Sequence, residues 1–455
     1  MPSDLDYALF STRVYDASKL NKTGVPAGWT ELRWQPDVSL TGFSAGGYRR
    51  GSEVVIAYTG TNDKNLDWLN SGLAVTGLLP APQIFDAMRF YLDVKAANPD
   101  ATSFTFTGHS LGGGLAALMG VFFGRQAVTF DQAPFENSAE SSLLHPDVAA
   151  NLKQYLLDKT LADPGQATAR DTLVSSLSKF QSLRQANGGI PNSNLVSTIR
   201  VDGEFLGTLP FDPIGAPATT LTHGSYFAPI DLHSQALLTT FLQSDAFRQM
   251  TSRLPELLGM VFDSSLFEYT TDTSNTRDRN LLEHLIRHQA DVRDPATGTV
   301  SIAADAMLDR FTSDLDKLVR AQGGSQGYRD LGKALIAFAM EKYYTETTDS
   351  PKFHQELFRV VTGGLQFDTK DIAVDITTAK GYSQYFANYL DTGPLFTFEE
   401  SRLIKQKIAD LRDWSIQGAN YPLDQDRSMV TDLMALQTDA RDMDGNNDTL
   451  WRIAA

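Results

Sequence analysis

A short glycine-rich segment carries a serine in surroundings that suit nucleophilic chemistry. Residues 108–113 read Gly-His-Ser-Leu-Gly-Gly. The preceding residues 103–107 are rich in β-formers, and residues 114–119 are small or straight-chain apolar helix formers. A serine between a strand and a helix in a Gly-x-Ser-x-Gly motif lies exposed on a sharp turn, beside the unpaired N–H groups of the helix's first turn, which can stabilise an oxyanion. The pattern predicts that Ser110 is a nucleophile.

A second Gly-x-Ser-x-Gly match at residues 42–46 lacks this context. Residues 47–51, which follow it, are turn-forming and do not favour a helix, and an apolar strand pattern comes next at 53–58. Ser44 is therefore predicted to lie in a β-meander and to take no part in catalysis.

A serine nucleophile needs a base to accept its proton and an acid to orient that base. In α/β-hydrolases these residues follow in the order serine, acid, histidine, since each lies on a loop after a successive strand. His109 is beside Ser110 within the turn, and His145 precedes any plausible acid strand. Of the seven histidines, His223 and His233 remain the main candidates for the base.

Two segments resemble the class 3 (fungal-type) lipases, a family of α/β-hydrolases. Residues 104–116 resemble the nucleophile turn of that family, and residues 55–61, followed by Asp67-Trp68, resemble the segment that provides its first oxyanion donor. The resemblance implies that the backbone N–H groups of Thr61 and Leu111 form the oxyanion hole. It covers about the first 245 residues.

The same resemblance extends to an acid segment and a histidine loop. Residues 200–210 resemble the acid segment, where counting back from Leu209-Pro210 favours Glu204, and counting forward from the strand favours Asp202. We favour Glu204, with Asp202 as the alternative acid and Asp212 as a weaker third choice. Residues 229–234 resemble the final histidine loop, which implies that His233 is the base and that His223 shapes the rim of the pocket.

These residues must be positioned by a sheet with flanking helices. The first 130 residues alternate helix-like and strand-like patterns, which predicts an α/β fold with an α/β-hydrolase core. Helices are predicted over 5–14, 82–97 and 234–242, and strands over 42–48, 53–58, 103–107, 127–130 and 197–201.

Two further regions are predicted to be helical. Leucine-rich residues 141–185 suggest a helical cap inserted over the catalytic face. Residues 246–455 form a mostly helical C-terminal region, with helices over 281–290, 302–322, 328–344, 399–417 and 427–440, interrupted by a β-like piece at 364–376. The predicted domains are thus 1–245 and 246–455.

Composition excludes several classes of protein. The net charge of −16 argues against a nucleic-acid partner, and the absence of cysteine excludes disulfides and a cysteine nucleophile. No apolar run is long enough to span a membrane, and the N-terminus does not have the pattern of a signal peptide. The expected location is secreted without a signal peptide, or cytoplasmic.

The substrate is expected to be a lipid ester. Apolar residues between 66 and 79, interrupted by Gly72 and Gly77, suit either a lid that opens at a lipid–water interface or ordinary core packing. We expect a triacylglycerol-type lipase, with phospholipase A1, a general esterase or a non-catalytic binding scaffold as alternatives. The mechanism requires no cofactor or metal; residues 442–450 resemble one calcium-binding repeat unit, which leaves calcium as a candidate structural ion.

Overall fold

The computed structural model describes residues 2–15, 23–36, 41–60, 82–140, 147–158, 163–224, 229–253 and some short segments between 257 and 367. The chain divides into two compact units. Unit 1 comprises Met1–His223, Phe227–Asp245 and Asp291–Ala304. Unit 2 comprises Gly224–Tyr226, Ala246–Ala290 and Asp305–Ala455. Unit 1 thus includes residues 291–304, which the predicted domain division at 245 assigned to the C-terminal region.

The core of unit 1 is a seven-stranded mixed sheet in the order β2-β3-β4-β5-β6-β7-β8. The first three strands pair antiparallel and those from β4 to β8 pair parallel. The strands are β2 (Thr30–Gln35), β3 (Ala45–Arg50), β4 (Glu53–Tyr58), β5 (Ser103–His109), β6 (Ala127–Phe130), β7 (Val196–Val201) and β8 (Thr219–Leu221). This sheet with its flanking helices confirms the predicted α/β-hydrolase fold.

The burial of the central strands explains their composition. All residues of β5 after Ser103 are buried, as are those of β4 after Glu53. A strand covered by helices on both faces has no polar face, which fits the apolar residues of β4. In β5, Thr105 and Thr107 alternate with Phe104 and Phe106 and are buried as well. Ser44 lies just before β3, in the antiparallel part of the sheet, which confirms its placement in a β-meander.

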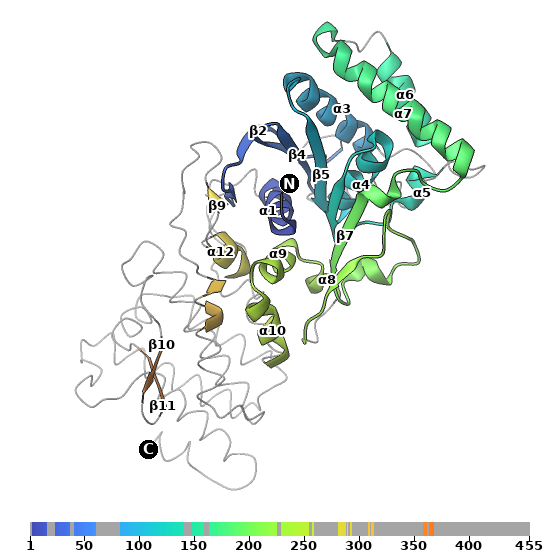
Figure 1. Ribbon diagram of the computed structural model, residues 1–455. Coiled ribbons are helices and arrows are strands. Elements are labelled where there is room, and N and C mark those ends of the chain that lie inside the picture. The colour runs from blue at the N-terminus through green and yellow to red at the C-terminus, as the bar shows by residue number, and fades with distance from the viewer. Residues whose placement is uncertain are drawn as a thin grey trace. The chain divides into compact units, whose positions relative to one another are not determined.

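Helices cover both faces of the sheet (Figure 1). On one face α1 (Asp4–Tyr15) packs against β5 and against α9 (Gln235–Gln243). On the other are α3 (Pro82–Ala97) and α4 (Leu111–Phe123), which contact each other. Helix α3 has the predicted bounds, and its buried Ile84, Met88 and Tyr91 lie at helical spacing.

The segment between β6 and β7 is helical, as predicted, but it packs elsewhere than expected. It contains α5 (Glu136–Ala139), α6 (Val148–Leu157), η2 (Pro164–Gln166), α7 (Ala167–Asn187) and η3 (Ser193–Leu195). Helix α7 packs against α3, α4 and α6, with the ring of Phe180 on that of Phe122 in α4. Figure 1 shows α6 and α7 on the far side of α4 from α8 (Pro229–Leu232) and α9. The prediction that this insertion covers the catalytic face is therefore wrong for α6 and α7.

The remaining described elements are few. In unit 1, β1 (Val25–Pro26) pairs antiparallel with β9 (Val292–Arg293). Later in the chain come α10 (Asp245–Arg253) and α12 (Leu281–Arg287), and β10 (Phe358–Val361) forms an antiparallel hairpin with β11 (Gly364–Phe367). The other predicted C-terminal helices lie largely or wholly outside the described residues, as do residues 66–79 and 442–450. None of the described helices is both long and apolar enough to cross a membrane.

Candidate active site

Ser110 lies on the turn between β5 and α4, and its backbone has a strained conformation. Its φ is 57° and its ψ is −126°, a region that residues with a side chain rarely adopt. Glycines make the turn possible. A Cβ atom on Gly108 would overlap the carbonyl of Gly112, and a Cβ on Gly112 would overlap the carbonyl oxygen of Tyr58. The close approach of β4, β5 and α4 therefore forces the serine outward.

A chain of two hydrogen bonds connects this serine to a histidine and a carboxylate. The Nε2 atom of His233 is 2.8 Å from Ser110 Oγ, and its Nδ1 atom is 2.9 Å from Glu204 Oε2. With the proton on Nδ1, the imidazole donates to Glu204 and can accept the serine proton. His233 follows α8 and immediately precedes Ser234, whose hydroxyl caps α9 by accepting from the N–H of Leu237.

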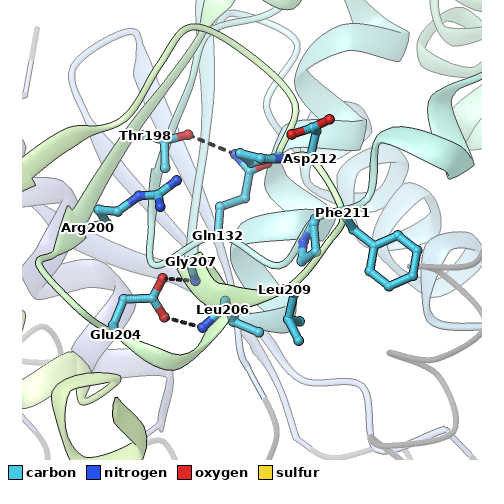
Figure 2. A pocket seen from close by; sticks show the side chains of 11 residues that line it. Gln132, Thr198, Arg200, Glu204, Leu206, Gly207, Leu209, Phe211 and Asp212 are labelled. Carbon is cyan, nitrogen blue, oxygen red and sulfur yellow. Dashed lines mark hydrogen bonds between the residues drawn. The ribbon is translucent and has the colours of Figure 1, made fainter.

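The Glu204 carboxylate is held on both oxygens. Oε2 accepts from the N–H of Leu206 at 2.6 Å, and Oε1 accepts from the N–H of Gly207 at 2.7 Å, so the side chain caps η4 (Phe205–Thr208). Figure 2 shows both of these hydrogen bonds. The residue is only 3% exposed. These two N–H groups, together with the His233 ring, hold both oxygens of the carboxyl group and fix its position against His233.

Asp202, the alternative acid, and His223, the alternative base, contact each other and are not part of the hydrogen bonds that join Ser110, His233 and Glu204. Asp202 is exposed; its backbone N–H donates to Leu221, and its carbonyl accepts from His223 Nε2 at 3.0 Å. Among the described residues, no hydrogen bond joins the Asp202 carboxylate to His233. Asp212 is also exposed. Of the three candidate acids, the structure brings only Glu204 to the histidine.

Of the two predicted oxyanion donors, Leu111 lies within the described residues. Leu111 is the first residue of α4, so its N–H belongs to the turn whose donors lack partners within the helix. Thr61 lies outside the described residues.

A cavity of about 180 Å³ is lined in part by Glu204 (Figure 2). Glu204 and Arg200 are part of its wall, and Phe211, which is 39% exposed, lies among its apolar lining. Its lining residues are Gln132, Pro134, Thr198, Arg200, Glu204, Leu206, Gly207, Leu209, Phe211, Asp212 and Pro213.

Sequence reasoning missed a buried acid beside the site. Asp131 follows β6 directly, at the same edge of the sheet as Ser110 and Glu204, and this position was the signal that could have identified it. Its Oδ2 atom lies 3.6 Å from Nε2 of His109.

Asp131, His109 and His233 offer potential metal ligands within 4.8 Å of one another. However, both ring nitrogens of His233 already have partners in Ser110 and Glu204. A metal held by all three residues would therefore displace one of these contacts.

Comparisons with known proteins agree with the geometry of the N-terminal part. Residues 6–209 match the model of the Tle-like phospholipase domain, which is less than half of the chain. The match includes Ser110 and Glu204 and ends before His233.

Two individual proteins are similar to parts of the chain. The extracellular phospholipase A1 of Serratia liquefaciens is 33% identical over 131 residues, 28% of this chain. The chain spans about a third of that relative's length. The crystal structure of a triacylglycerol lipase from Penicillium expansum is 13% identical, and the likeness covers 47% of this chain and 76% of that one with a TM-score of 0.25. At that TM-score the likeness carries no functional argument. The family model and the relative support a hydrolase of the lipase or phospholipase kind.

Proposed function

We propose that this protein is a serine hydrolase of carboxylic esters in lipids. The observation that carries the proposal is the hydrogen-bonded chain from Glu204 through His233 to Ser110, at 2.9 Å and 2.8 Å. A serine on a strained strand-to-helix turn, a histidine facing it and a buried carboxylate behind the histidine together have the parts needed for acyl transfer.

In the proposed reaction Ser110 Oγ attacks the ester carbonyl while His233 Nε2 takes the serine proton. The carbonyl oxygen becomes an oxyanion that accepts from the N–H of Leu111 and, as the family resemblance implies, of Thr61. The tetrahedral intermediate then expels the alcohol, which receives the proton from His233, and leaves an acyl ester on Ser110. Water attacks that ester by the same route and releases the carboxylic acid.

We propose phospholipids as the first substrate class and triacylglycerols as the second. The sequence alone favoured triacylglycerols. The matched domain and the Serratia relative are both described as phospholipases, which supports the first choice. In both classes the scissile bond is a carboxylic ester, so the residues named above would act in the same way.

The test is acyl release by the full-length chain from two substrates in parallel. One is a vesicle of diacyl phospholipid labelled in the sn-1 acyl chain, and the other is an emulsion of a long-chain triacylglycerol. We expect faster release from the vesicle and none with Ser110→Ala. Faster release from the emulsion would favour the triacylglycerol lipase, and equal release by the wild type and Ser110→Ala would refute the serine mechanism. If neither substrate is hydrolysed but short-chain p-nitrophenyl esters are, the protein is a general esterase. Lipid binding without any hydrolysis would indicate a binding scaffold.

A further inference from the structure

Asp131 has a backbone conformation that is unfavourable for a residue with a side chain. Its φ is 39°, and outside glycine the described chain adopts a positive φ only at Ser110, Asp131 and Asn192. Such positions cost free energy and persist where the surrounding structure enforces them, often at functional sites. Asp131 is fully buried at the end of β6, with its N–H donating to the carbonyl of Ile199 in β7.

The Asp131 carboxyl group has one satisfied and one unsatisfied oxygen. Oδ1 accepts from the N–H of Val201 at 2.9 Å. Oδ2 has no hydrogen-bond partner, and neither has Nε2 of His109, although the two atoms lie 3.6 Å apart. His109 is 4% exposed, so both are polar atoms removed from water. The two buried atoms face each other, so a proton on one of them that points toward the other would satisfy both.

The site contains two carboxyl groups, and their surroundings differ. Glu204 accepts from three N–H groups, those of Leu206, Gly207 and His233. Asp131 accepts from one. Burial and then the charge of Glu204 raise the pKa of Asp131 well above its usual value. Asp131, which is buried with a single donor, is therefore the carboxyl group that keeps a proton.

We propose that Asp131 is a neutral carboxylic acid whose Oδ2–H donates to Nε2 of His109, and that this pair positions the catalytic His233. The link to catalysis rests on the proposed function; the protonation of Asp131 does not. The rings of His109 and His233 have their centroids 4.7 Å apart at an interplanar angle of 36°. The His109 ring, when it is fixed in place, thus packs against the His233 ring and limits its orientation.

Tyr15 completes the network from the opposite side. Its hydroxyl lies 2.9 Å from His109 Nδ1, so a His109 that accepts on Nε2 can donate its Nδ1–H to Tyr15. This tautomer is neutral. Burial and the neighbouring His233 lower the pKa of His109 well below its usual value. A neutral His109 matters because His233 becomes an imidazolium when it takes the serine proton, and a second cation 4.7 Å away would oppose that step.

The first test compares Asp131→Asn with Asp131→Leu in the full-length protein. Asparagine is neutral, accepts from Val201 and can donate its amide to His109 Nε2, so kcat/KM at pH 7 should stay within about threefold of wild type. Leucine is similar in size but makes neither hydrogen bond, and it should lower kcat by about ten- to a hundredfold with little change in KM. Asp171→Asn, an exposed substitution on α7, is the matched control. A large loss of kcat in Asp131→Asn would overturn the proposal, because it would mean that the negative charge of Asp131 is needed.

The pH profile gives a readout that a merely structural role would not change. The titratable and charged groups around Asp131 are Glu204, His109, His233, Arg200 and Tyr15. In the wild type, Asp131 should lose its proton at alkaline pH and with it the bond to His109, so that kcat falls. Asp131→Asn should lack this decline. An identical alkaline decline in both proteins would contradict the proposal.

Infrared spectroscopy tests the proton itself, independently of catalysis. The difference spectrum between wild type and Asp131→Asn at pH 7 should contain the C=O stretch of a protonated carboxylic acid. The same band should be present when both proteins also carry Ser110→Ala. A carboxylate band in its place would overturn the proposal even if Ser110 is confirmed as the nucleophile. Conversely, the acid band with an active Ser110→Ala protein would refute the proposed function and leave the protonation of Asp131 standing.

Discussion

Replacing Glu204 by glutamine should separate the roles of the two neighbouring acids. The substitution keeps the shape of the side chain but removes the negative charge that lies 2.9 Å from the His233 ring. With an effective dielectric constant of about 20, two unit charges at that separation attract by about 6 kcal/mol. The attraction is present only when His233 is an imidazolium, so its loss raises the barrier by up to about 6 kcal/mol, roughly a 10⁴-fold fall in kcat.

The structure also predicts a loss of stability in Glu204→Gln. The two carboxylate oxygens accept from the N–H groups of Leu206 and Gly207, and a glutamine side chain has only one oxygen. One donor in this half-buried turn is then left without its acceptor, which should lower the free energy of unfolding by about 1–3 kcal/mol. Urea denaturation measures this loss separately from activity.

The assay is kcat for hydrolysis of a soluble p-nitrophenyl ester, with Asp202→Asn as the matched control. Asp202 is exposed, and its hydrogen bonds to Leu221 and His223 are made by its backbone, so its substitution should change kcat by less than about twofold. The reasoning fails if Asp202→Asn loses as much activity as Glu204→Gln. It fails equally if Glu204→Gln retains more than a tenth of the wild-type rate.

Three further predictions follow from the backbone and from the buried titratable groups. Ser110→Gly should abolish ester hydrolysis yet raise the melting temperature, because glycine relieves a φ of 57°; a lower melting temperature would contradict this account of strain. Gly112→Ala should prevent the turn between β5 and α4 from forming, because the added Cβ meets the Tyr58 carbonyl, and circular dichroism should detect little folded protein. The control is Gly165→Ala, whose Cβ meets only the Asp163 side chain at 3.3 Å and which should fold normally. As the pH rises above about 4, the free energy of unfolding of the wild type should fall relative to that of Asp131→Asn, by up to about 1.4 kcal/mol per pH unit. The reason is that the raised pKa of Asp131 makes the folded state bind more protons than the unfolded state. Urea denaturation measures both free energies, and parallel curves against pH would contradict the prediction.

Strong local patterns allowed much of the fold to be predicted from the sequence. The predicted bounds of α3 and β4 match the structure because both elements have long apolar patterns with clear ends. Strand β2 was missed because all of its residues are exposed or half-buried, and β8 because it has only three residues. The packing of α7 was misjudged because periodicity shows which face of a helix is apolar and leaves open which neighbour covers it.

Backbone conformation explains why the acid stayed ambiguous. Asp202 and Glu204 flank Gly203, whose φ of 75° turns the chain sharply between them. That turn leaves Asp202 exposed and Glu204 buried, and no residue pattern indicates its direction. Asp131 was missed for a similar reason, since its positive φ and its proximity to His109 arise only when β5, β6 and β7 lie side by side.

Covalent labelling tests the central claim most directly. A fluorophosphonate reacts only with a serine that an adjacent base activates, and mass spectrometry of the digested protein identifies the modified residue. We predict a single adduct on Ser110, absent in Ser110→Ala and formed at least about a hundredfold more slowly in His233→Ala. An adduct on Ser44, or labelling of Ser110 that is unaffected by His233→Ala, would contradict the account.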